Sequence, residues 1–140
     1  MNLNHKLVVA VVTRNETKIW ATDAVKGEEP TVVTPLPEGH HHVRDAQHNN
    51  GHDSHAQDKK YYEEIFKALQ PADEILLIGH GKGKGNAVLQ FVQHIERHHH
   101  DLAKKIVGSI DENIVAMTDG ELLAAARNWF KHHAHGAAGF

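Results

Sequence analysis

Two short apolar runs constrain the fold of this 140-residue chain more than any other feature. The run "KLVVAVVT" (residues 6–13) is rich in β-branched residues, and "DEILLIG" (residues 73–79) is apolar after its acidic start. Both have the length of a strand, and a strand that is apolar on both faces is typical of the covered interior of a sheet. The sequence therefore predicts an α/β domain built around buried strands.

The remaining elements follow from hydrophobic periodicity and turn signals. The predicted strands are residues 6–13, 16–22, 30–36, 73–79 and 103–110. The predicted helices are residues 58–70, 86–99 and 118–130. Only Arg14 and Asn15 separate the first two strands, which predicts a hairpin. The order β-β-β-α-β-α-β-α matches an RNase H-like domain, with a five-stranded mixed sheet and helices on both faces.

Length and composition indicate one domain, over residues 1–131, with a flexible tail at residues 132–140. A polar segment at residues 37–57 holds six histidines and is predicted to be a loop, which at this length is functional or disordered. There is no cysteine and no run of eighteen apolar residues, so we expect a cytoplasmic protein without a membrane span. The oligomeric state is not predicted.

A glycine-rich turn, "GHGKGKGN" (residues 79–86), follows the second apolar run. It satisfies neither the P-loop nor the dinucleotide-binding pattern, because lysine or asparagine stands where the last glycine is required. Backbone N–H groups of successive glycines still converge easily on an anion. The alternative is a solvent-exposed corner without a ligand. The predicted anion or RNA contact comprises Gly79, Gly81, Lys82, Gly83, Lys84, Gly85, Asn86 and Arg44.

Fifteen histidines raise the question of metal binding. His94 and His98 stand four residues apart on a predicted helix, a spacing that can chelate zinc or nickel. The loop adds a run of three, His40, His41 and His42. A specific site needs three or four ligands fixed by surrounding hydrogen bonds. We therefore predict no resident cofactor, only adventitious capture of zinc or nickel.

Catalytic signatures are missing from the sequence. A two-metal nuclease requires clustered carboxylates, and the first strand of an RNase H-like nuclease supplies one of them. Here that strand has no acid, and the scattered acids are interpreted as surface residues: Glu16, Asp73, Asp111 and Asp119. Trp20, on the predicted hairpin, is the candidate exposed ring for stacking a base, and Trp129 is placed at the core boundary. The sequence predicts no catalytic residue.

Three segments carry a resemblance to a known family: "VTRNETKIWATD", the long stretch from "DKKYYEEIF" through "HHHDLAKKIVG", and "TDGELLAAARNWF". Together they resemble small bacterial proteins related to the middle domain of class 1 translation release factors and of Pelota. The resemblance implies an RNase H-like fold. In release factors the segment equivalent to the histidine loop carries a Gly-Gly-Gln tip. Here Asn50 and Gly51 are followed by His52, so peptide release is not implied.

The sequence thus predicts a non-catalytic translation module that binds the ribosome or RNA. Its contact surface would combine the glycine turn with the loop, whose tip is His48, Asn49, Asn50, Gly51 and His52. The alternatives are a histidine-rich metal-binding or stress protein, and an enzyme that acts on a phosphorylated small molecule at the glycine turn. A net charge of −3 requires any RNA contact to be local, because broad nucleic-acid surfaces are basic.

Overall fold

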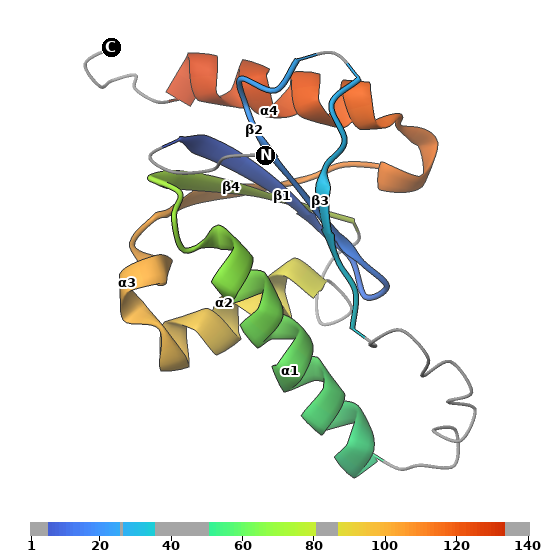
Figure 1. Cartoon of the computed structure of the whole chain (residues 1–140), viewed down its shortest axis with the longest axis vertical. Helices are drawn as coiled ribbons and strands as arrows, with labels where there is room; N and C mark the ends of the chain where they lie inside the picture. Colours follow the sequence, from blue (N-terminus) through green and yellow to red (C-terminus); the bar gives the residue numbers. More distant parts are fainter. Residues whose placement is uncertain (1–5, 26, 36–50, 81–86, 134–140) are drawn as a thin grey trace.

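The computed structural model describes residues 6–25, 27–35, 51–80 and 87–133. They form a five-stranded mixed sheet with helices on both faces (Figure 1). The strands are β1 (Leu7–Val12), β2 (Thr17–Ala21), β3 (Thr31–Val33), β4 (Glu74–Gly79) and β5 (Ile106–Asp111). The helices are α1 (Gly51–Leu69), α2 (Ala87–His98), α3 (His100–Ala103) and α4 (Asp119–His133), with a 3-10 turn, η3 (Ile114–Ala116). The predicted α/β class and mixed sheet are confirmed.

The strand order is β3-β2-β1-β4-β5. β2 pairs antiparallel with both β1 and β3, whereas β4 pairs parallel with β1 and β5. The predicted hairpin of β1 and β2 and the interior position of β4 are therefore confirmed. Thr17 lies opposite both Val12 and Val33, and Gly79 lies opposite Asp111. The carboxyl ends of β1, β3, β4 and β5 consequently meet at one side of the sheet, called the carboxyl edge below.

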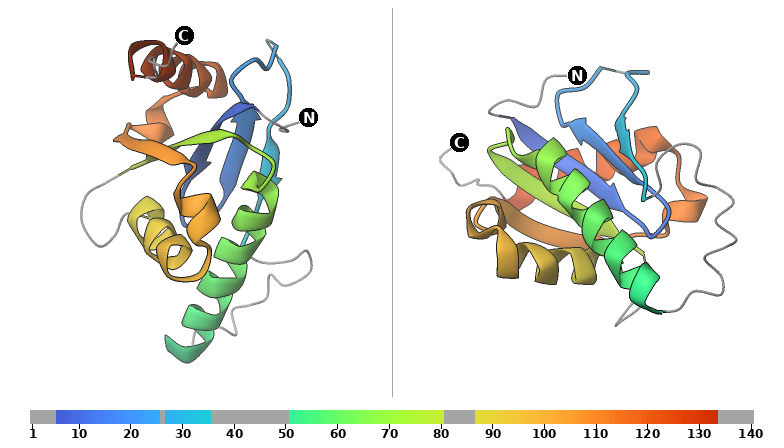
Figure 2. Two further views of the ribbon diagram at one scale, coloured as in Figure 1. Left: turned by 90° about the vertical axis from the view of Figure 1, so that its left-hand side faces the viewer. Right: turned by 60° about the horizontal axis from the view of Figure 1, so that its bottom comes forward.

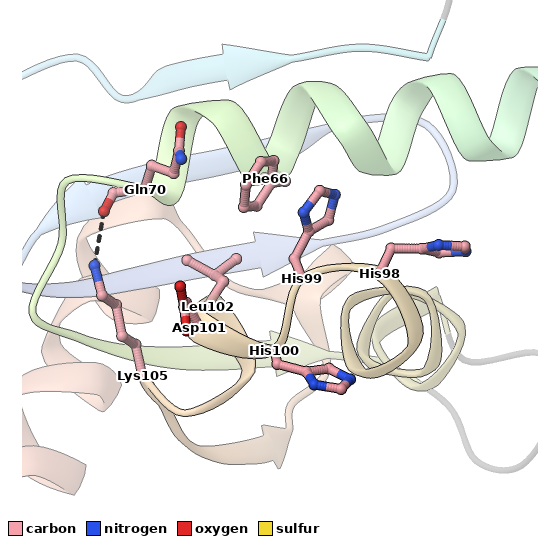
Figure 3. Close-up of a pocket in the computed structure, with 8 residues that line it drawn as sticks. All are labelled: Phe66, Gln70, His98, His99, His100, Asp101, Leu102 and Lys105. Atoms are coloured by element: carbon pink, nitrogen blue, oxygen red, sulfur yellow. Dashed lines mark hydrogen bonds between the residues drawn. The ribbon is translucent and has the colours of Figure 1, made fainter.

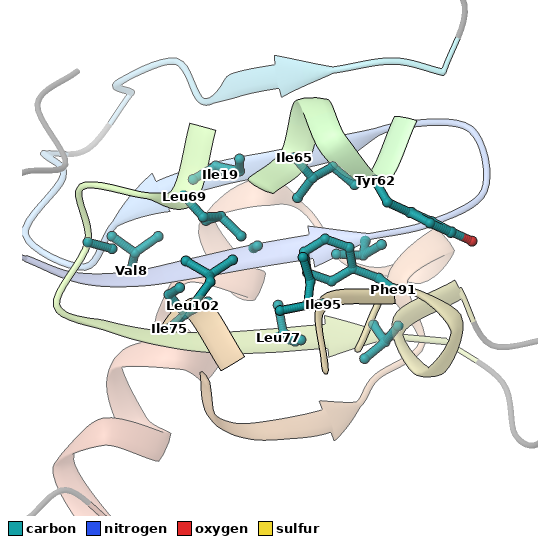
Figure 4. Close-up of a cluster of buried hydrophobic side chains, with 14 of the residues drawn as sticks. Val8, Ile19, Tyr62, Ile65, Leu69, Ile75, Leu77, Phe91, Ile95 and Leu102 are labelled. Carbon is teal, nitrogen blue, oxygen red and sulfur yellow. The ribbon is translucent and has the colours of Figure 1, made fainter. Parts of the chain in front are cut away.

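The side chains of the sheet divide into two cores by simple alternation. In β1, Val8, Ala10 and Val12 point to one core, while Val9 and Val11 point to the other. The first core is covered by α1, α2 and α3, and Figure 4 shows their side chains meeting those of the sheet. The second core is covered by α4, which lies across the opposite face (Figure 2).

The same alternation corrects the prediction for Trp20. Its side chain is 2% exposed and belongs to the core beneath α4, so it is not an exposed ring that could stack a base. The reason is its place in β2: Ile19 and Ala21 face the first core, which turns Trp20 toward the second. Trp129 packs half-buried against the margin of that second core, as predicted.

Several boundaries differ from the prediction. β3 covers only Thr31–Val33 of the predicted residues 30–36, β5 begins at Ile106 instead of residue 103, and residues 100–103 form a short helix, α3, that was not predicted. α1 begins at Gly51, so residues 51–57 are helical rather than part of the predicted loop. The prediction placed the start of the helix at the first residues with apolar spacing, whereas α1 projects beyond the sheet, where no apolar face is required (Figure 2). Toward the C-terminus, α4 continues through His133, whereas a flexible tail was predicted from residue 132. The ring of His133 stacks on Trp129 with centroids 4.3 Å apart.

At Gly108 in β5 the sheet and α4 approach each other closely. A Cβ atom at this residue would lie 2.6 Å from Cζ2 of Trp129. We expect Gly108→Ala to lower the free energy of unfolding by about 1–3 kcal/mol, because the indole must shift within a packed layer. Urea denaturation measures the change.

The neighbouring substitution Ser109→Ala is the control, since Ser109 is exposed and already carries a Cβ atom. It should change stability by less than about 0.5 kcal/mol. In a Trp129→Leu background the cost of Gly108→Ala should largely disappear. An equal cost in both backgrounds would show that the indole is not its cause.

Candidate functional site

A hollow of about 400 Å³ lies at the carboxyl edge of the sheet. It is lined by the turn between β1 and β2, by the residues that flank the glycine turn, and by η3. These residues are Val12, Thr13, Arg14, Asn15, Glu16, His80, Ala87, Ile114 and Val115. Ligands of open α/β sheets bind outside the carboxyl ends of the strands, so this edge is the first candidate site.

The turn between β1 and β2 is held by Thr13. Its hydroxyl donates to the carbonyl oxygen of Glu16 at 2.9 Å and accepts the N–H groups of Asn15 and Glu16 at 3.2 and 3.1 Å. The backbone N–H of Thr13 also donates to the same carbonyl at 3.0 Å. These bonds fix the turn, and the side chain of Arg14 is exposed at its tip. The edge therefore presents a cation on a well-ordered turn.

His80 adds a titratable ring on the other side of the hollow. Its Nδ1 lies 3.0 Å from the carbonyl oxygen of Glu112, which can only accept, so Nδ1 carries the proton in this contact. Gly79 before it ends β4, and its own carbonyl accepts the N–H of Glu112 at 2.9 Å. The end of β4 is thereby tied to the end of β5.

Acidic side chains at the same edge are paired with a lysine. Nζ of Lys18 lies 3.0 Å from Asp119 and 3.7 Å from Glu16. The hydrogen bond to Asp119 is the main cause that raises the pKa of Lys18, and the charge of Glu16 adds to it. Asp73 precedes β4 and so lies at the opposite end of the strands. Of the four acids considered for a nuclease, Glu16 and Asp119 thus contact the same lysine and Asp111 ends β5 at the same edge, whereas Asp73 lies at the other end of the sheet.

Most of the residues predicted for RNA binding lie outside the described residues. This applies to Gly81–Asn86 of the glycine turn, to Arg44, and to His40–His42 and His48–Asn50 of the loop. Gly51 and His52 form the start of α1, and their side chains are also outside the described part. Arg14 and His80, which line the hollow, were not among the site residues predicted from the sequence. Their position directly after the two buried strands could have identified them.

A second group of polar side chains gathers between α1 and α2. Nε2 of His94 and Nε2 of His99 both lie 2.7 Å from the same oxygen, Oε2 of Glu63. Burial disfavours the charged carboxylate, but the hydrogen bonds from both histidines outweigh it and lower the pKa of Glu63. In the described part of the chain, Glu63, His94 and His99 form a group whose ligand atoms all lie within 4.8 Å of one another, close enough to hold one metal ion.

This arrangement changes the partner predicted for His94. The rings of His94 and His98 lie with centroids 4.6 Å apart, but His98 is exposed and the atoms of His94 that could bind a ligand face Glu63 and His99. His99 follows the last residue of α2 and points toward Phe66 of α1, whereas His98 and His100 point elsewhere (Figure 3). A helical spacing rule could not find His99 or Glu63, because His99 is five residues from His94 rather than three or four, and Glu63 lies on a different helix.

No family model matches the chain, and no curated protein matches it either. Among the described residues, no helix combines the length and the apolar character needed to cross a membrane.

Tyr61 connects α1 to the carboxyl edge. Its hydroxyl donates to the carbonyl oxygen of Thr13 at 2.8 Å, and the buried hydroxyl of Thr17 lies 2.8 Å from the same phenolic oxygen. Tyr61→Phe leaves both partners without this bond, so the free energy of unfolding should fall by about 1–3 kcal/mol. Urea denaturation measures it, and Tyr62→Phe, at a partly exposed bond to Gln90, should cost less.

The same hydroxyl predicts a pH dependence. Burial raises the pKa of Tyr61 to about 12, above its value of about 10 in an unfolded chain. Its contribution to stability is therefore complete below pH 10 and is lost as the pH rises through 12, because only the unfolded chain ionises readily. The stability difference between the native protein and Tyr61→Phe should narrow as the pH rises from about 10 to about 12. A difference that stays constant would contradict the assignment.

Proposed function

We propose that this protein is an RNase H-like module, related to the middle domain of class 1 release factors and Pelota, that binds RNA on the ribosome. The strand order β3-β2-β1-β4-β5, with an antiparallel start and parallel β1, β4 and β5, supports the fold assignment. The position of Gly-Gly-Gln is taken by Asn50, Gly51 and His52, so the module binds without releasing peptide.

One observation carries the proposal: the strands that precede the histidine-rich segment and the glycine turn both end at the carboxyl edge. β3, which precedes the histidine-rich segment, ends there, because Val33 lies opposite Thr17. β4, which precedes the glycine turn, ends there beside β1 and β5. The described residues on either side of the glycine–lysine segment, His80 and Ala87, line the same hollow as Arg14. Arg14, Lys82 and Lys84 supply the local positive charge that phosphates require.

The charge balance favours a small contact over a broad one. The chain carries −3 overall, and Lys18 is already paired with Asp119 and Glu16 at this edge. A few cations on fixed turns can neutralise a few phosphates, which gives a shallow dependence of affinity on salt.

The test is co-sedimentation of the tag-free protein with ribosomes at about 50 mM and about 200 mM salt, with gel shifts on RNA. The triple substitution Arg14→Ala, Lys82→Ala and Lys84→Ala should weaken binding. It should also reduce the slope of log affinity against log salt by about one for each phosphate that is no longer neutralised. If the native protein binds neither ribosomes nor RNA, the proposal is wrong.

A charge-matched control removes three lysines away from the carboxyl edge. Lys67 lies in the last turn of α1, Lys104 precedes β5, and Lys131 lies in the last turn of α4. Replacing these three by alanine changes the net charge equally and should leave the salt slope unchanged. An equal loss of binding in both triple variants would indicate nonspecific attraction rather than a site.

A further inference from the structure

The group formed by Glu63, His94 and His99 is built from three separate parts of the fold. Glu63 lies on α1, His94 on α2, and His99 between α2 and α3. Both imidazole Nε2 atoms lie 2.7 Å from Oε2 of Glu63, and all three ligand atoms lie within 4.8 Å of one another. Glu63 is 31 positions from His94 and 36 from His99, so the packing of α1 on α2 brings distant residues to a single point.

The two rings are held in place by neighbouring aromatic side chains. The ring of His99 stacks on Phe66 with centroids 3.6 Å apart and planes 12° from parallel. The side chain of His94 is only 10% exposed and lies beside Tyr62, with centroids 5.5 Å apart. Rings fixed in this way lose little freedom on binding a ligand, which is the condition that separates a built site from a chance surface pair.

We propose that Glu63, His94 and His99 form a binding site for a divalent transition cation of the zinc class. Two imidazole nitrogens and one carboxylate oxygen are a zinc ligand set found in sites that keep a further position open. Tetrahedral zinc with bonds of about 2.0–2.2 Å separates neighbouring ligand atoms by roughly 3.3 Å. The two hydrogen-bonded distances of 2.7 Å, from Oε2 of Glu63 to Nε2 of each histidine, need only small side-chain movements to reach that spacing.

The fourth position is accessible from solvent. The carboxylate side chain of Glu63 is 37% exposed, and that of His99 is 22% exposed, so water can reach the ligand atoms. Beside His99 a hollow of about 420 Å³ opens between α1 and α3, lined in part by Phe66, Gln70 and Lys105 (Figure 3). The ion would be bound at the surface of the helical layer, not enclosed within the core.

The competing explanation is a proton-held cluster, in which one carboxylate oxygen accepts an N–H from each ring. Binding of the cation requires each Nε2 to lose its proton: in a neutral ring the hydrogen moves to Nδ1, in a protonated ring it is released to solvent, and Nε2 then offers its lone pair. The two explanations predict different effects of zinc on stability. An ion that needs residues 63, 94 and 99 together stabilises the folded protein, which a proton-held cluster does not allow. Histidines that are adjacent in sequence bind zinc in the unfolded chain as well, so they stabilise the fold less.

The experiment compares melting temperatures of chelator-stripped, tag-free protein with EDTA and with added zinc chloride. The native protein should melt about 9 °C higher when zinc is near 100 times the Kd. The increment should fall to below about 1 °C in Glu63→Gln and in His99→Gln. For each variant, the melting temperature in EDTA shows the effect of the lost hydrogen bonds. The further rise in melting temperature on adding zinc shows only the effect of the ion.

His100→Gln is the matched control, because it removes an adjacent exposed histidine that does not belong to the group of three. It should keep the full increment. The proposal is overturned if zinc up to millimolar concentration leaves the native melting temperature unchanged, which is the result expected of a proton-held cluster. It is also overturned if all variants retain the same increment, because zinc then acts through other histidines.

Discussion

The parallel pairing of β1 with β4 is the interaction on which the rest of the structure depends. Val8 to Val12 and Ile75 to Ile78 are at most 2% exposed, so both strands are buried on both faces. A parallel pair requires a crossover connection, and here α1 belongs to it while covering one face. The second face then needs its own cover, which α4 provides. The pairing also sets the register that brings the turn after β1 beside His80 after β4.

The sequence predicts those parts of the fold in which burial produces a recognisable pattern of apolar residues. Continuous apolar runs identified β1 and β4 as interior strands, and two intervening polar residues identified the hairpin. The start of α1 could not be predicted in the same way, since its first turns extend past the sheet and need no apolar face. Trp20 was misjudged because alternation gives the two faces of a strand but not whether both are covered.

The candidate sites differ in the same respect. The carboxyl edge could be anticipated from the sequence, because strand ends and turns are visible there, although Arg14 and His80 were overlooked. The contact of Glu63 with His99 depends on how α1 crosses α2, and no local pattern encodes a crossing of helices. Tertiary packing, which places Phe66 against the ring of His99, decides this second site.

α1 is the element that the two sites share. Tyr61 fixes it to the turn at the carboxyl edge, and Glu63, two residues later, fixes it to α2. Residues separated by two on a helix point about 200° apart, so one helix can serve two different neighbours at nearly the same level. A cation at Glu63 would therefore act on the edge by holding α1 in place, not by contributing charge to it.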